Sequence, residues 1–459
     1  MITAKEMRKI ISDLYLKDRT MVCDDYDYCL NYLKRYLDFT IYEYPSSRAY
    51  WNWIIPDKYT VREAYIRDVK TSKILIDSKD HPLHLASYSA PFSGVLDYEE
   101  LRKHLYWNEK VPGAIPNYYK LQYRPWEKDW KFCLSYNQLK RFNKKGMFEI
   151  KIDTLFEKGT LKVAEYLKKG RTKDTIVIVS HLDHPGQVND GLSGVVVELA
   201  LMREIAERDT HYSYLFLIVQ EFLGSVAYLS DHMDIVKDLK MGIFAEMLTT
   251  GLKPQLQKSF TGVSYIDRIA EMVFKERLER FDILDYLEGA GNDEIVFESP
   301  GIEVPFISVM RARSKGKLYR QYHTHLDNLE MVDDKQLDEA LKLLTGIVDT
   351  LEEDFYIERK FEGFICLSNP NLGIYFNENE FICGRKIDSA VQARLHSFLF
   401  GGFRYFDGCH RISDIAIRYE IPFEILLEFI KRMERKGLVA LSPNKKTVRE
   451  CQQEKVYVK

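Results

Sequence analysis

Long apolar segments and an excess of one charge are both missing from this sequence of 459 residues. Because no uninterrupted apolar run approaches the roughly 20 residues that cross a bilayer, we expect no membrane-spanning helix. The 66 basic and 69 acidic side chains give a formal net charge of −3, so charge does not indicate nucleic acid or an anionic membrane as the main partner. The 46% share of hydrophobic residues also excludes a mainly disordered chain.

Cysteine is scarce and scattered, because the seven cysteines contain no C-x-x-C pair. This spacing predicts reduced thiols, and neither a disulfide framework nor a structural zinc site. The segment MITAKEMRKIISDLYLK carries charges where a signal peptide has an uninterrupted apolar core, so we expect a soluble, cytoplasmic protein. The sequence also lacks G-x-G-x-x-G, Walker-type and H-E-x-x-H motifs, which leaves nucleotide-binding and single-zinc protease functions without support.

The hydrophobic pattern divides the chain into four parts. Residues 1–55 have helix-spaced apolar residues and form the helical start of the main domain. Residues 56–147 are rich in proline, aromatic residues and short alternating runs, which predicts a small inserted β-rich domain. Residues 148–380 alternate strands with helices, and residues 381–459 have the helix, turn, helix and strand order of a winged helix-turn-helix domain.

The third part predicts an α/β fold with a mainly parallel, mixed sheet sandwiched by helices. Continuous apolar strands that alternate with helices are typical of a sheet covered on both faces. The long amphipathic segment 333–355 predicts a helix with an acidic first turn. The predicted strands are TIVIVS (175–180), YLFLIVQ (214–220), MGIFAEM (241–247) and VPFISVM (304–310).

Imidazole and carboxylate side chains stand at the ends of these strands. Each alone has an ordinary explanation as a surface loop, a helix cap or a structural histidine, but together they fall at one end of the predicted sheet, where open α/β folds place their sites. Two imidazoles and three carboxylates suit a pair of divalent ions with one bridging carboxylate. These residues are His181, Asp190, Glu221, Glu246 and His323.

The order of these residues resembles the co-catalytic zinc exopeptidases, a clan that includes bacterial aminopeptidases. The resemblance covers roughly residues 150–355. The whole chain is similar to bacterial proteins that join an aminopeptidase-like domain, an inserted β module and a C-terminal winged helix, some of them associated with polysaccharide biosynthesis. The resemblance rests on His181-x-Asp183, Asn189-Asp190-x-x-Ser193-Gly194, Glu221, Glu246 and His323-Thr324-x-x-Asp327.

The resemblance implies a role for each of the five candidate ligands. His181 and Glu246 would bind one zinc ion, Glu221 and His323 would bind a second, and Asp190 would bridge the two. Glu246 stands where the clan usually has an aspartate, one methylene shorter.

Two further residues of the first loop take roles from the same resemblance. Asp183 would orient His181 as a carboxylate behind the metal ligand. His184 is an alternative ligand to His181, because the smaller bacterial group has Cys-His-Pro where this chain has Asp183-His184-Pro185. We place His181 first, since it fits the His-x-Asp of the wider clan.

Gln220 departs from the clan, which usually carries Glu-Glu where this chain has Gln220-Glu221. The first glutamate of that pair takes a proton from water, and a glutamine cannot accept one. Either Glu221 is the base and one metal ligand is missing, or another group serves, or hydrolysis has been lost. If the backbone follows the clan, Gln220→Glu is expected to raise activity.

Three other residues are candidate substrate contacts. Asp293 precedes the strand at 304–310, and an acidic turn is an equally good explanation for it. Arg311 follows that strand and could bind a substrate carboxylate, although a structural ion pair is the commoner role for such a residue. Tyr322 adjoins His323.

We therefore predict a metal-dependent amide hydrolase, specifically an aminopeptidase-like exopeptidase that uses one or two zinc ions. The substrate would be a peptide or another amide, including an amide in a saccharide. The alternative is a catalytically degenerate fold that binds a ligand or regulates through the winged helix. Residues 409–459 hold 11 basic and 7 acidic residues, which favours a packing or interaction role over sequence-specific DNA binding. The sequence leaves the metal and the homo-oligomeric state open.

Overall fold

The computed structural model describes residues 2–374, 380–382 and 385–446, and its largest element is a mixed sheet. Within these residues eight strands form this sheet in the order β1-β10-β12-β11-β13-β16-β14-β15. β12, β11, β13 and β16 are mutually parallel, and antiparallel pairings join β10 and β14 to this centre. The strands are β1 (Thr40–Pro45), β10 (Thr160–Lys168), β12 (Ser213–Val219), β11 (Thr175–His181), β13 (Leu239–Ala245), β16 (Phe306–Met310), β14 (Gln255–Gln257) and β15 (Asp282–Leu284).

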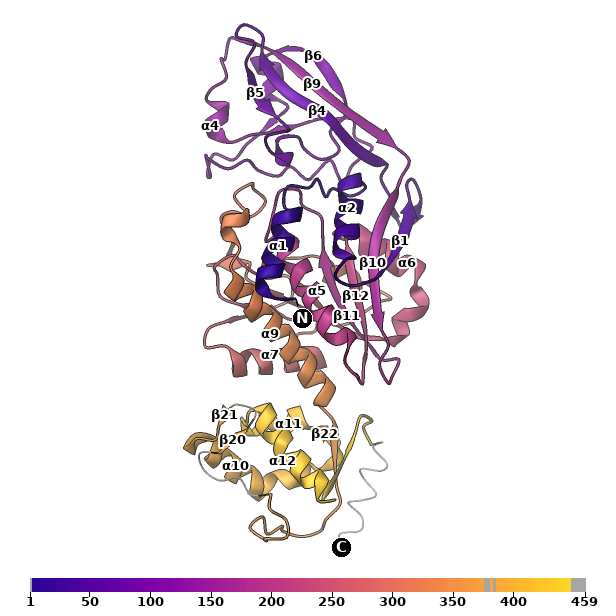
Figure 1. Cartoon of the computed structure of the whole chain (residues 1–459), viewed down its shortest axis with the longest axis vertical. Coiled ribbons are helices and arrows are strands. Elements are labelled where there is room, and N and C mark those ends of the chain that lie inside the picture. Colours follow the sequence, from indigo (N-terminus) through magenta and orange to yellow (C-terminus); the bar gives the residue numbers. More distant parts are fainter. Residues whose placement is uncertain (1, 375–379, 383–384, 447–459) are drawn as a thin grey trace. The chain divides into compact units, whose positions relative to one another are not determined.

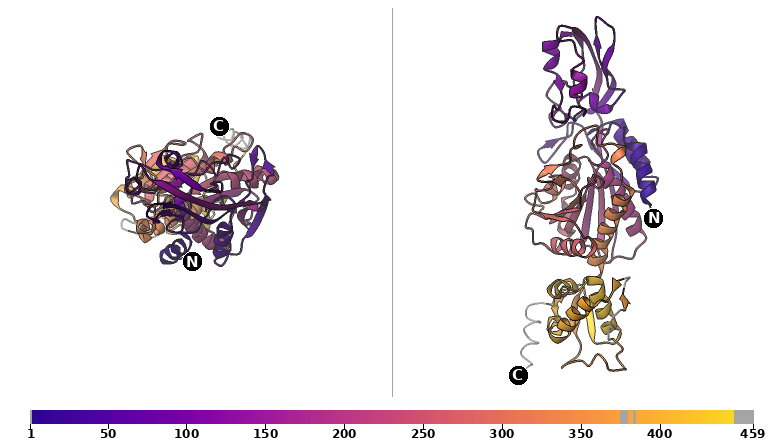
Figure 2. Two further views of the ribbon diagram at one scale, coloured as in Figure 1. Left: turned by 90° about the horizontal axis from the view of Figure 1, so that it is seen from above. Right: turned by 90° about the vertical axis from the view of Figure 1, so that its left-hand side faces the viewer.

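Helices flank this sheet, as Figures 1 and 2 show. The predicted α/β class with a mixed sheet between helices is therefore confirmed. The predicted segment 333–355 is also helical, as α9. The helices up to residue 353 are α1 (Ala4–Leu14), α2 (Asp24–Leu33), α3 (Tyr98–Arg102), α4 (Tyr136–Leu139), α5 (Leu192–Ala206), α6 (Leu223–Asp231), α7 (Tyr265–Arg277), α8 (Glu294–Phe297) and α9 (Asp334–Glu353).

The four predicted strands are present, within two residues at each end, as β11, β12, β13 and β16. β11 and β12 are buried along their whole length, because both faces of the sheet are covered. This explains why their sequences are continuously apolar and not alternating. The continuous apolar pattern of these segments thus predicted both strand structure and burial on both faces.

The connections of the central strands create a switch point at the site. From β11 the chain passes through α5 to β12 on one side, and from β12 it returns through α6 to β13 on the other side of β11. Right-handed crossovers in opposite directions put α5 and α6 on opposite faces. Folds with such a switch point bind ligands at the carboxyl ends of the strands on either side of it, which here are β11 and β13.

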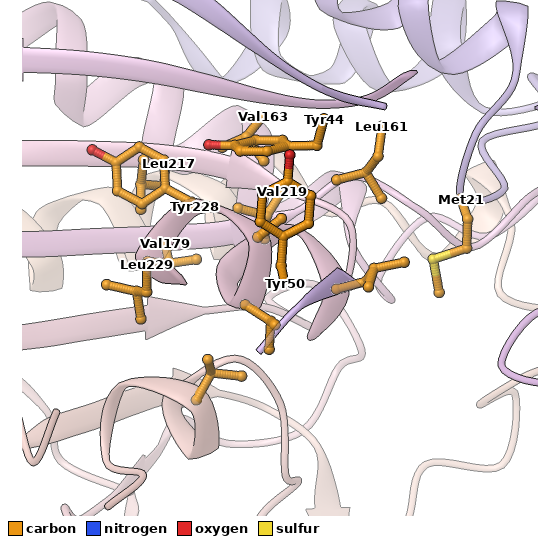
Figure 3. Packing of buried hydrophobic residues seen from close by; sticks show 14 of the residues in the cluster. Met21, Tyr44, Tyr50, Leu161, Val163, Val179, Leu217, Val219, Tyr228 and Leu229 are labelled. Carbon is orange, nitrogen blue, oxygen red and sulfur yellow. The ribbon is translucent and has the colours of Figure 1, made fainter. Parts of the chain in front are cut away.

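The hydrophobic core on one face of the sheet joins β10, β11 and β12 to α6. Tyr44 and Tyr50 pack edge to face with ring centroids 5.1 Å apart, and both are buried. Val179 and Leu217 project from neighbouring strands into the same cluster, as Figure 3 shows. This packing holds β11 and β12 in a fixed register beneath the site.

A second sheet, in the order β5-β4-β9-β6, forms the inserted β-rich module. All its pairings are antiparallel. The predicted limit of this module at residue 147 coincides with the first residue of β9, so we propose that the module extends to about residue 157. Its strands are β4 (Lys58–Asp68), β5 (Ile74–Asp77), β6 (Phe92–Asp97) and β9 (Met147–Glu157), and short ribbons are β2 (Ala49–Tyr50) with β3 (Trp53–Ile54) and β7 (Leu105–Tyr106) with β8 (Phe132–Cys133).

The described residues within 269–278 and 345–459 group as a second compact unit. Its three-stranded sheet has β19 in the centre, antiparallel to β22 and β23. The predicted order of helix, turn, helix and strand is present as α11, α12 and β23, while the winged-helix assignment stays a prediction. The elements are β19 (Tyr356–Arg359), β20 (Phe381–Ile382), β21 (Arg385–Lys386), α10 (Ser389–Gly401), β22 (Asp407–Arg411), α11 (Ile412–Tyr419), α12 (Phe423–Arg435) and β23 (Val439–Ser442).

One described cysteine, Cys409, differs from the predicted reduced state. Cys23, Cys29, Cys133 and Cys366 are free, as predicted. Cys409 is disulfide-bonded, so the prediction is wrong at that position. Cys383 and Cys451 lie outside the described residues. No helix in the described part of the chain is both long and apolar enough to cross a bilayer.

We expect a chain that ends at Asp354 to remain folded, because the large sheet and α9 are complete before that residue. A chain that ends at Phe381, the sequence-predicted boundary, retains β19 but loses both partners of this strand. Unpaired strand edges promote association. Size-exclusion chromatography and thermal melting should therefore show a monodisperse, cooperatively unfolding shorter chain and an aggregating longer one. An aggregated shorter chain would show that residues after 354 cover apolar surface of the main domain.

Candidate metal centre

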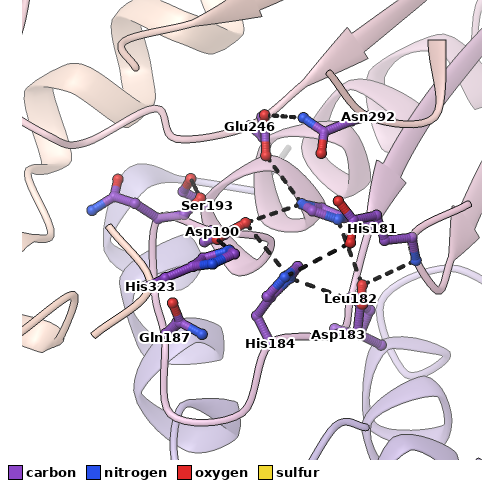
Figure 4. Close-up of polar contacts among 12 residues, drawn as sticks. His181, Leu182, Asp183, His184, Gln187, Asp190, Ser193, Glu246, Asn292 and His323 are labelled. Carbon is purple, nitrogen blue, oxygen red and sulfur yellow. Dashed lines mark hydrogen bonds and ion pairs between the residues drawn. The ribbon is translucent and has the colours of Figure 1, made fainter. Parts of the chain in front are cut away.

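The first group of ligands lies at the switch point between β11 and β13. His181 is the last residue of β11, and its Nε2 lies 3.1 Å from Glu246 Oε2 and 3.5 Å from Asp190 Oδ1. All three side chains are buried. Their ligand atoms lie within 4.8 Å of one another, a separation that a single ion can bridge. Figure 4 shows the three side chains pointing toward one another.

The second group shares Asp190 with the first. His323 Nε2 lies 2.9 Å from Asp190 Oδ2, and His184 Nδ1 lies 3.6 Å from Asp190 Oδ1. His184, Asp190 and His323 again place one ligand atom each within 4.8 Å of the others. His181 and His184 each belong to one of these two triads, and a further group of His181, Asp183 and His184 contains both of them.

The pKa values of the side chains in these triads depend on burial and on the charges of the neighbouring side chains. Burial lowers the pKa of His184 to about 4, against the opposing effect of Asp190. Burial alone would lower the pKa of His181 too, but the hydrogen bond to Glu246 and the nearby carboxylates raise it well above its usual range. Burial raises the pKa of Asp190, yet the three histidines outweigh that effect and hold it below its usual range.

Asp190 is held in place through its own backbone. Asp327 is buried, and its carboxylate accepts the backbone N–H groups of Asn189 and Asp190 at 3.0 Å each. The same carboxylate accepts the side-chain amide of Asn189 and the hydroxyl of Tyr319, both at 3.0 Å. The Asp at the end of the His-Thr-x-x-Asp motif thus positions the bridging residue of the other motif.

Ser193 and Gly194 explain the rest of the Asn-Asp-x-x-Ser-Gly motif. The Ser193 hydroxyl donates to the Asn189 carbonyl at 2.9 Å and accepts the Leu248 N–H at 3.0 Å, which ties the loops after β11 and β13 together. A Cβ at Gly194 would lie 2.0 Å from the Ala245 carbonyl oxygen. Only glycine lets the start of α5 approach β13 so closely.

Strained backbone surrounds the same place. Four non-glycine residues next to the site have positive φ angles, a conformation that costs of order 1–3 kcal/mol for each residue. Such strain persists only where the surrounding structure enforces it, and it clusters at functional sites. These residues are His184 (73°), Phe222 (57°), Met247 (51°) and His323 (52°).

Glu221 joins the cluster but belongs to neither triad. Its Oε2 lies 3.9 Å from His184 Nε2 and accepts a hydrogen bond of 2.5 Å from the Tyr123 hydroxyl. Burial and the neighbouring Asp183 raise the pKa of Glu221 well above its usual range. Asp183 Oδ1 lies 3.5 Å from His181 Nδ1 and accepts the Glu221 N–H at 3.1 Å. The structure thus brings all five predicted ligands and Asp183 together.

Gln220 is directed elsewhere. Its side chain is buried, and its amide donates a hydrogen bond to the backbone carbonyl of Met21. A glutamate at this position would set a carboxylate against a carbonyl oxygen, with no donor between them. The Gln220 side chain therefore points away from the cluster that Glu221 joins, because adjacent residues at the end of β12 point in different directions. The effect of Gln220→Glu on activity stays a prediction.

The three predicted substrate contacts have different surroundings. Asp293 accepts the Ser225 hydroxyl at 2.6 Å and the Phe222 N–H at 3.1 Å, so one of its oxygens anchors the start of α6. Arg311 forms an ion pair with Glu339, the structural role named as its alternative. Tyr322 stacks on His323 with ring centroids 3.9 Å apart.

Sequence reasoning missed two residues of the site. Tyr123 lies in the aromatic-rich segment that predicts the inserted module, yet its hydroxyl contacts Glu221. Gln187 is fully buried next to the triads, and neither atom of its amide has a hydrogen-bond partner in the described part of the chain. No local sequence pattern predicts that either side chain lies at the site, because both residues lie in loops.

A model of the domain family of unknown function DUF4910 matches residues 8–354. The chain belongs to the DUF4910 family. A Clostridium acetobutylicum protein, whose name joins polysaccharide biosynthesis with an aminopeptidase-like domain, is 29% identical to this DUF4910 protein over 357 residues. That alignment covers 77% of this chain and 79% of the relative.

Solved structures share the fold of this DUF4910 protein. A C. acetobutylicum structure named as a peptidase has a TM-score of 0.80 at 24% identity and covers 96% of both chains. The zinc aminopeptidase BSAP of Bacillus subtilis has a TM-score of 0.55 at 15% identity, over 76% of this chain and 95% of BSAP. An M28 peptidase precursor from Shewanella amazonensis has a TM-score of 0.51 at 13% identity, over 75% and 92%. The predicted resemblance to zinc aminopeptidases is confirmed for the fold.

We expect Asp327→Asn to destabilise the protein, because an amide would replace a carboxylate acceptor and face the N–H groups of Asn189 and Asp190. Leaving buried donors unsatisfied costs about 1–3 kcal/mol. Guanidinium denaturation measures the loss against Asp338→Asn, which changes a half-exposed carboxylate paired with Lys342. Equal stability of the two variants would contradict the anchoring role of Asp327.

Proposed function

We propose that this DUF4910 protein is a metal-dependent amide hydrolase with the chemistry of an aminopeptidase. One observation carries the proposal, namely two ligand triads that share Asp190 at the carboxyl ends of parallel strands. Divalent zinc fits the donors, since imidazole and carboxylate are its usual ligands together with thiolate. Two shared-carboxylate sites are the arrangement of two-metal hydrolases.

The unpaired atoms of the cluster also fit a cation. Asp183 Oδ2, His181 Nδ1 and His184 Nδ1 are buried without a hydrogen-bond partner in the described part of the chain. Buried polar atoms of this kind are costly unless an ion or another partner satisfies them. Several carboxylates in so small a volume likewise need positive charge nearby.

The two triads divide the ligands differently from the resemblance. His181, Asp190 and Glu246 would hold one ion, and His184, Asp190 and His323 would hold the other. Zinc bound there would polarise the scissile carbonyl and make water acidic enough to attack near neutral pH. This division frees Glu221 from the role of ligand.

Glu221 would then be the general base, a role that the amide of Gln220 cannot fill. A carboxylate oxygen of Glu221 would take the proton of the attacking water and return it to the nitrogen of the leaving amine. The Tyr123 hydroxyl holds Glu221 Oε2 through a 2.5 Å hydrogen bond and so fixes the direction of that carboxylate. The competing function, a degenerate fold that only binds ligands, rested on Gln220 and is weakened by a carboxylate in this position.

The substrate is proposed as a small peptide or another amide. The proposal also includes a cytoplasmic location, a homo-oligomeric state and a winged helix that acts as an interaction module. The metal and the base, in contrast, can each be tested with single substitutions.

We expect about two zinc ions per chain in the purified protein, as a shared-carboxylate centre requires. Asp190→Asn should lose both ions because both triads include Asp190, and His184→Ala should lose one. Elemental analysis after dialysis measures the content. His396→Ala is the matched control, since His396 is exposed and outside the triads. If His184→Ala retained two ions, Glu221 and not His184 would be the ligand of the second ion.

We expect Glu221→Gln to lower turnover of amino-acid p-nitroanilides by about 10²- to 10⁴-fold, the usual contribution of a general base. Its zinc content should stay unchanged, because a base holds a proton and not the ion. Glu207→Gln, at an exposed carboxylate, serves as the control. Loss of zinc together with activity would make Glu221 a ligand, and unchanged activity would exclude it from the reaction.

A further inference from the structure

A separate cavity of about 320 Å³ lies beside Tyr123. This volume is at the lower end of the range that small-molecule sites occupy. Three segments build the cavity, two from the N-terminal third of the chain and one from the start of α6. The lining residues are Asn52, Trp53, Ile54, Pro56, Gln122, Tyr123, Pro125, Trp126 and Leu223.

Two residues that line the cavity, Tyr123 and Leu223, connect it to Glu221, the proposed base. The Tyr123 hydroxyl donates to Glu221 Oε2, and Leu223 follows Glu221 by two residues in the chain. Phe222 between them packs near Trp53 and Tyr123, with ring centroids 6.4 and 6.5 Å away. A group bound in the cavity therefore contacts Tyr123, whose hydroxyl binds Glu221, while Glu221 itself does not line the cavity.

The walls are uncharged and include two exposed indoles. Trp126 is 64% exposed and Trp53 is 37% exposed, although burying an indole is strongly favourable. None of the described residues that line the cavity carries a charge at neutral pH. A charged substituent would thus lose its hydration without finding a partner there.

The polarity of the walls distinguishes between neutral ligands. An aliphatic side chain is best held in an enclosed apolar slot, whereas these indoles present open faces. A pyranose ring has C–H groups on its faces and hydroxyls at its edge, so it can stack on an indole and hydrogen-bond to an amide at once. Asn52 supplies an exposed amide, while Gln122 is buried and hydrogen-bonds to Tyr123.

We propose that this cavity binds a neutral sugar ring of an amide-bearing saccharide and presents its acylamido group to Glu221. The proposal rests on the proposed hydrolase function and names the class of substrate. Trp53 and Trp126 would hold the ring, and Asn52 would bind a hydroxyl at its edge. A ligand in this cavity would cover the exposed face of Trp126.

Binding is tested with the neutral probe N,N′-diacetylchitobiose by ligand-observed NMR titration of the full chain. We expect saturable binding that weakens by about tenfold or more in Trp126→Ala and in Trp53→Ala, since each loses one stacked aromatic face. Trp126→Phe should retain part of the affinity because it keeps an aromatic ring. Phe260→Ala is the matched control, because Phe260 is 71% exposed and does not line the cavity. Thermal melting shows that each variant is folded.

Other outcomes overturn the proposal. Absence of saturable binding, or equal affinity in folded Trp126→Ala and wild type, would exclude a sugar site here. Binding of N-acetyl-leucinamide that depends on Trp126, without binding of the saccharide, would make the cavity a side-chain pocket. The hydrolase function is tested apart from this, because Glu221→Gln should still bind the probe. Saccharide binding without any amide hydrolysis would contradict the hydrolase, whereas peptide-amide hydrolysis without saccharide binding would contradict only the cavity.

Discussion

The site is governed by the cost of burying charge. Asp183, Asp190 and Glu246 are at most 1% exposed, and His181 and His184 share their environment. An isolated buried carboxylate costs on the order of several kcal/mol, so these groups can only be kept together by mutual pairing and by positive charge. The short loops after β11 and β13, their positive φ angles and the Asp327 anchor all serve to hold this unfavourable concentration of acidic groups in place.

The inserted module takes part in the site and is not only an appendage. Its segment from Ile115 to Asn117 pairs with the loop that carries His323, since the Asn117 N–H donates to the His323 carbonyl at 2.8 Å. Tyr119 packs against the His323 ring at 5.2 Å, and Tyr123 reaches Glu221. One insertion therefore orients a proposed ligand, holds the proposed base and contributes the exposed Trp126 to the neighbouring cavity. Substrate selection and catalysis would then be coupled through the same segment.

The pair Gln220–Glu221 shows how much one residue of register matters. β12 ends at Val219, and beyond it Gln220 turns to the Met21 carbonyl while Glu221 joins the cluster. In the sequence, Gln220-Glu221 resembles the Glu-Glu pair of the zinc exopeptidases with its first glutamate, the general base, replaced by glutamine. In the fold the carboxylate that remains stands next to His184, and the histidine that looked redundant completes a second triad. Under the proposed function, neighbouring residues would thus exchange the roles of base and ligand.

The sequence by itself determined the central strands and α9, and it predicted five ligand side chains that the fold brings close together. Continuous β-branched runs are read locally, and parallel strands necessarily bring their carboxyl ends to one edge. Only the tertiary structure decided that His184 joins Asp190 and His323, that Gln220 turns away and that Tyr123 meets Glu221. It also placed β19 in the tail's sheet and bound Cys409 in a disulfide. These features depend on loop conformation and on contacts between residues as far apart as positions 123 and 221, and neither local propensity nor periodicity carries such information.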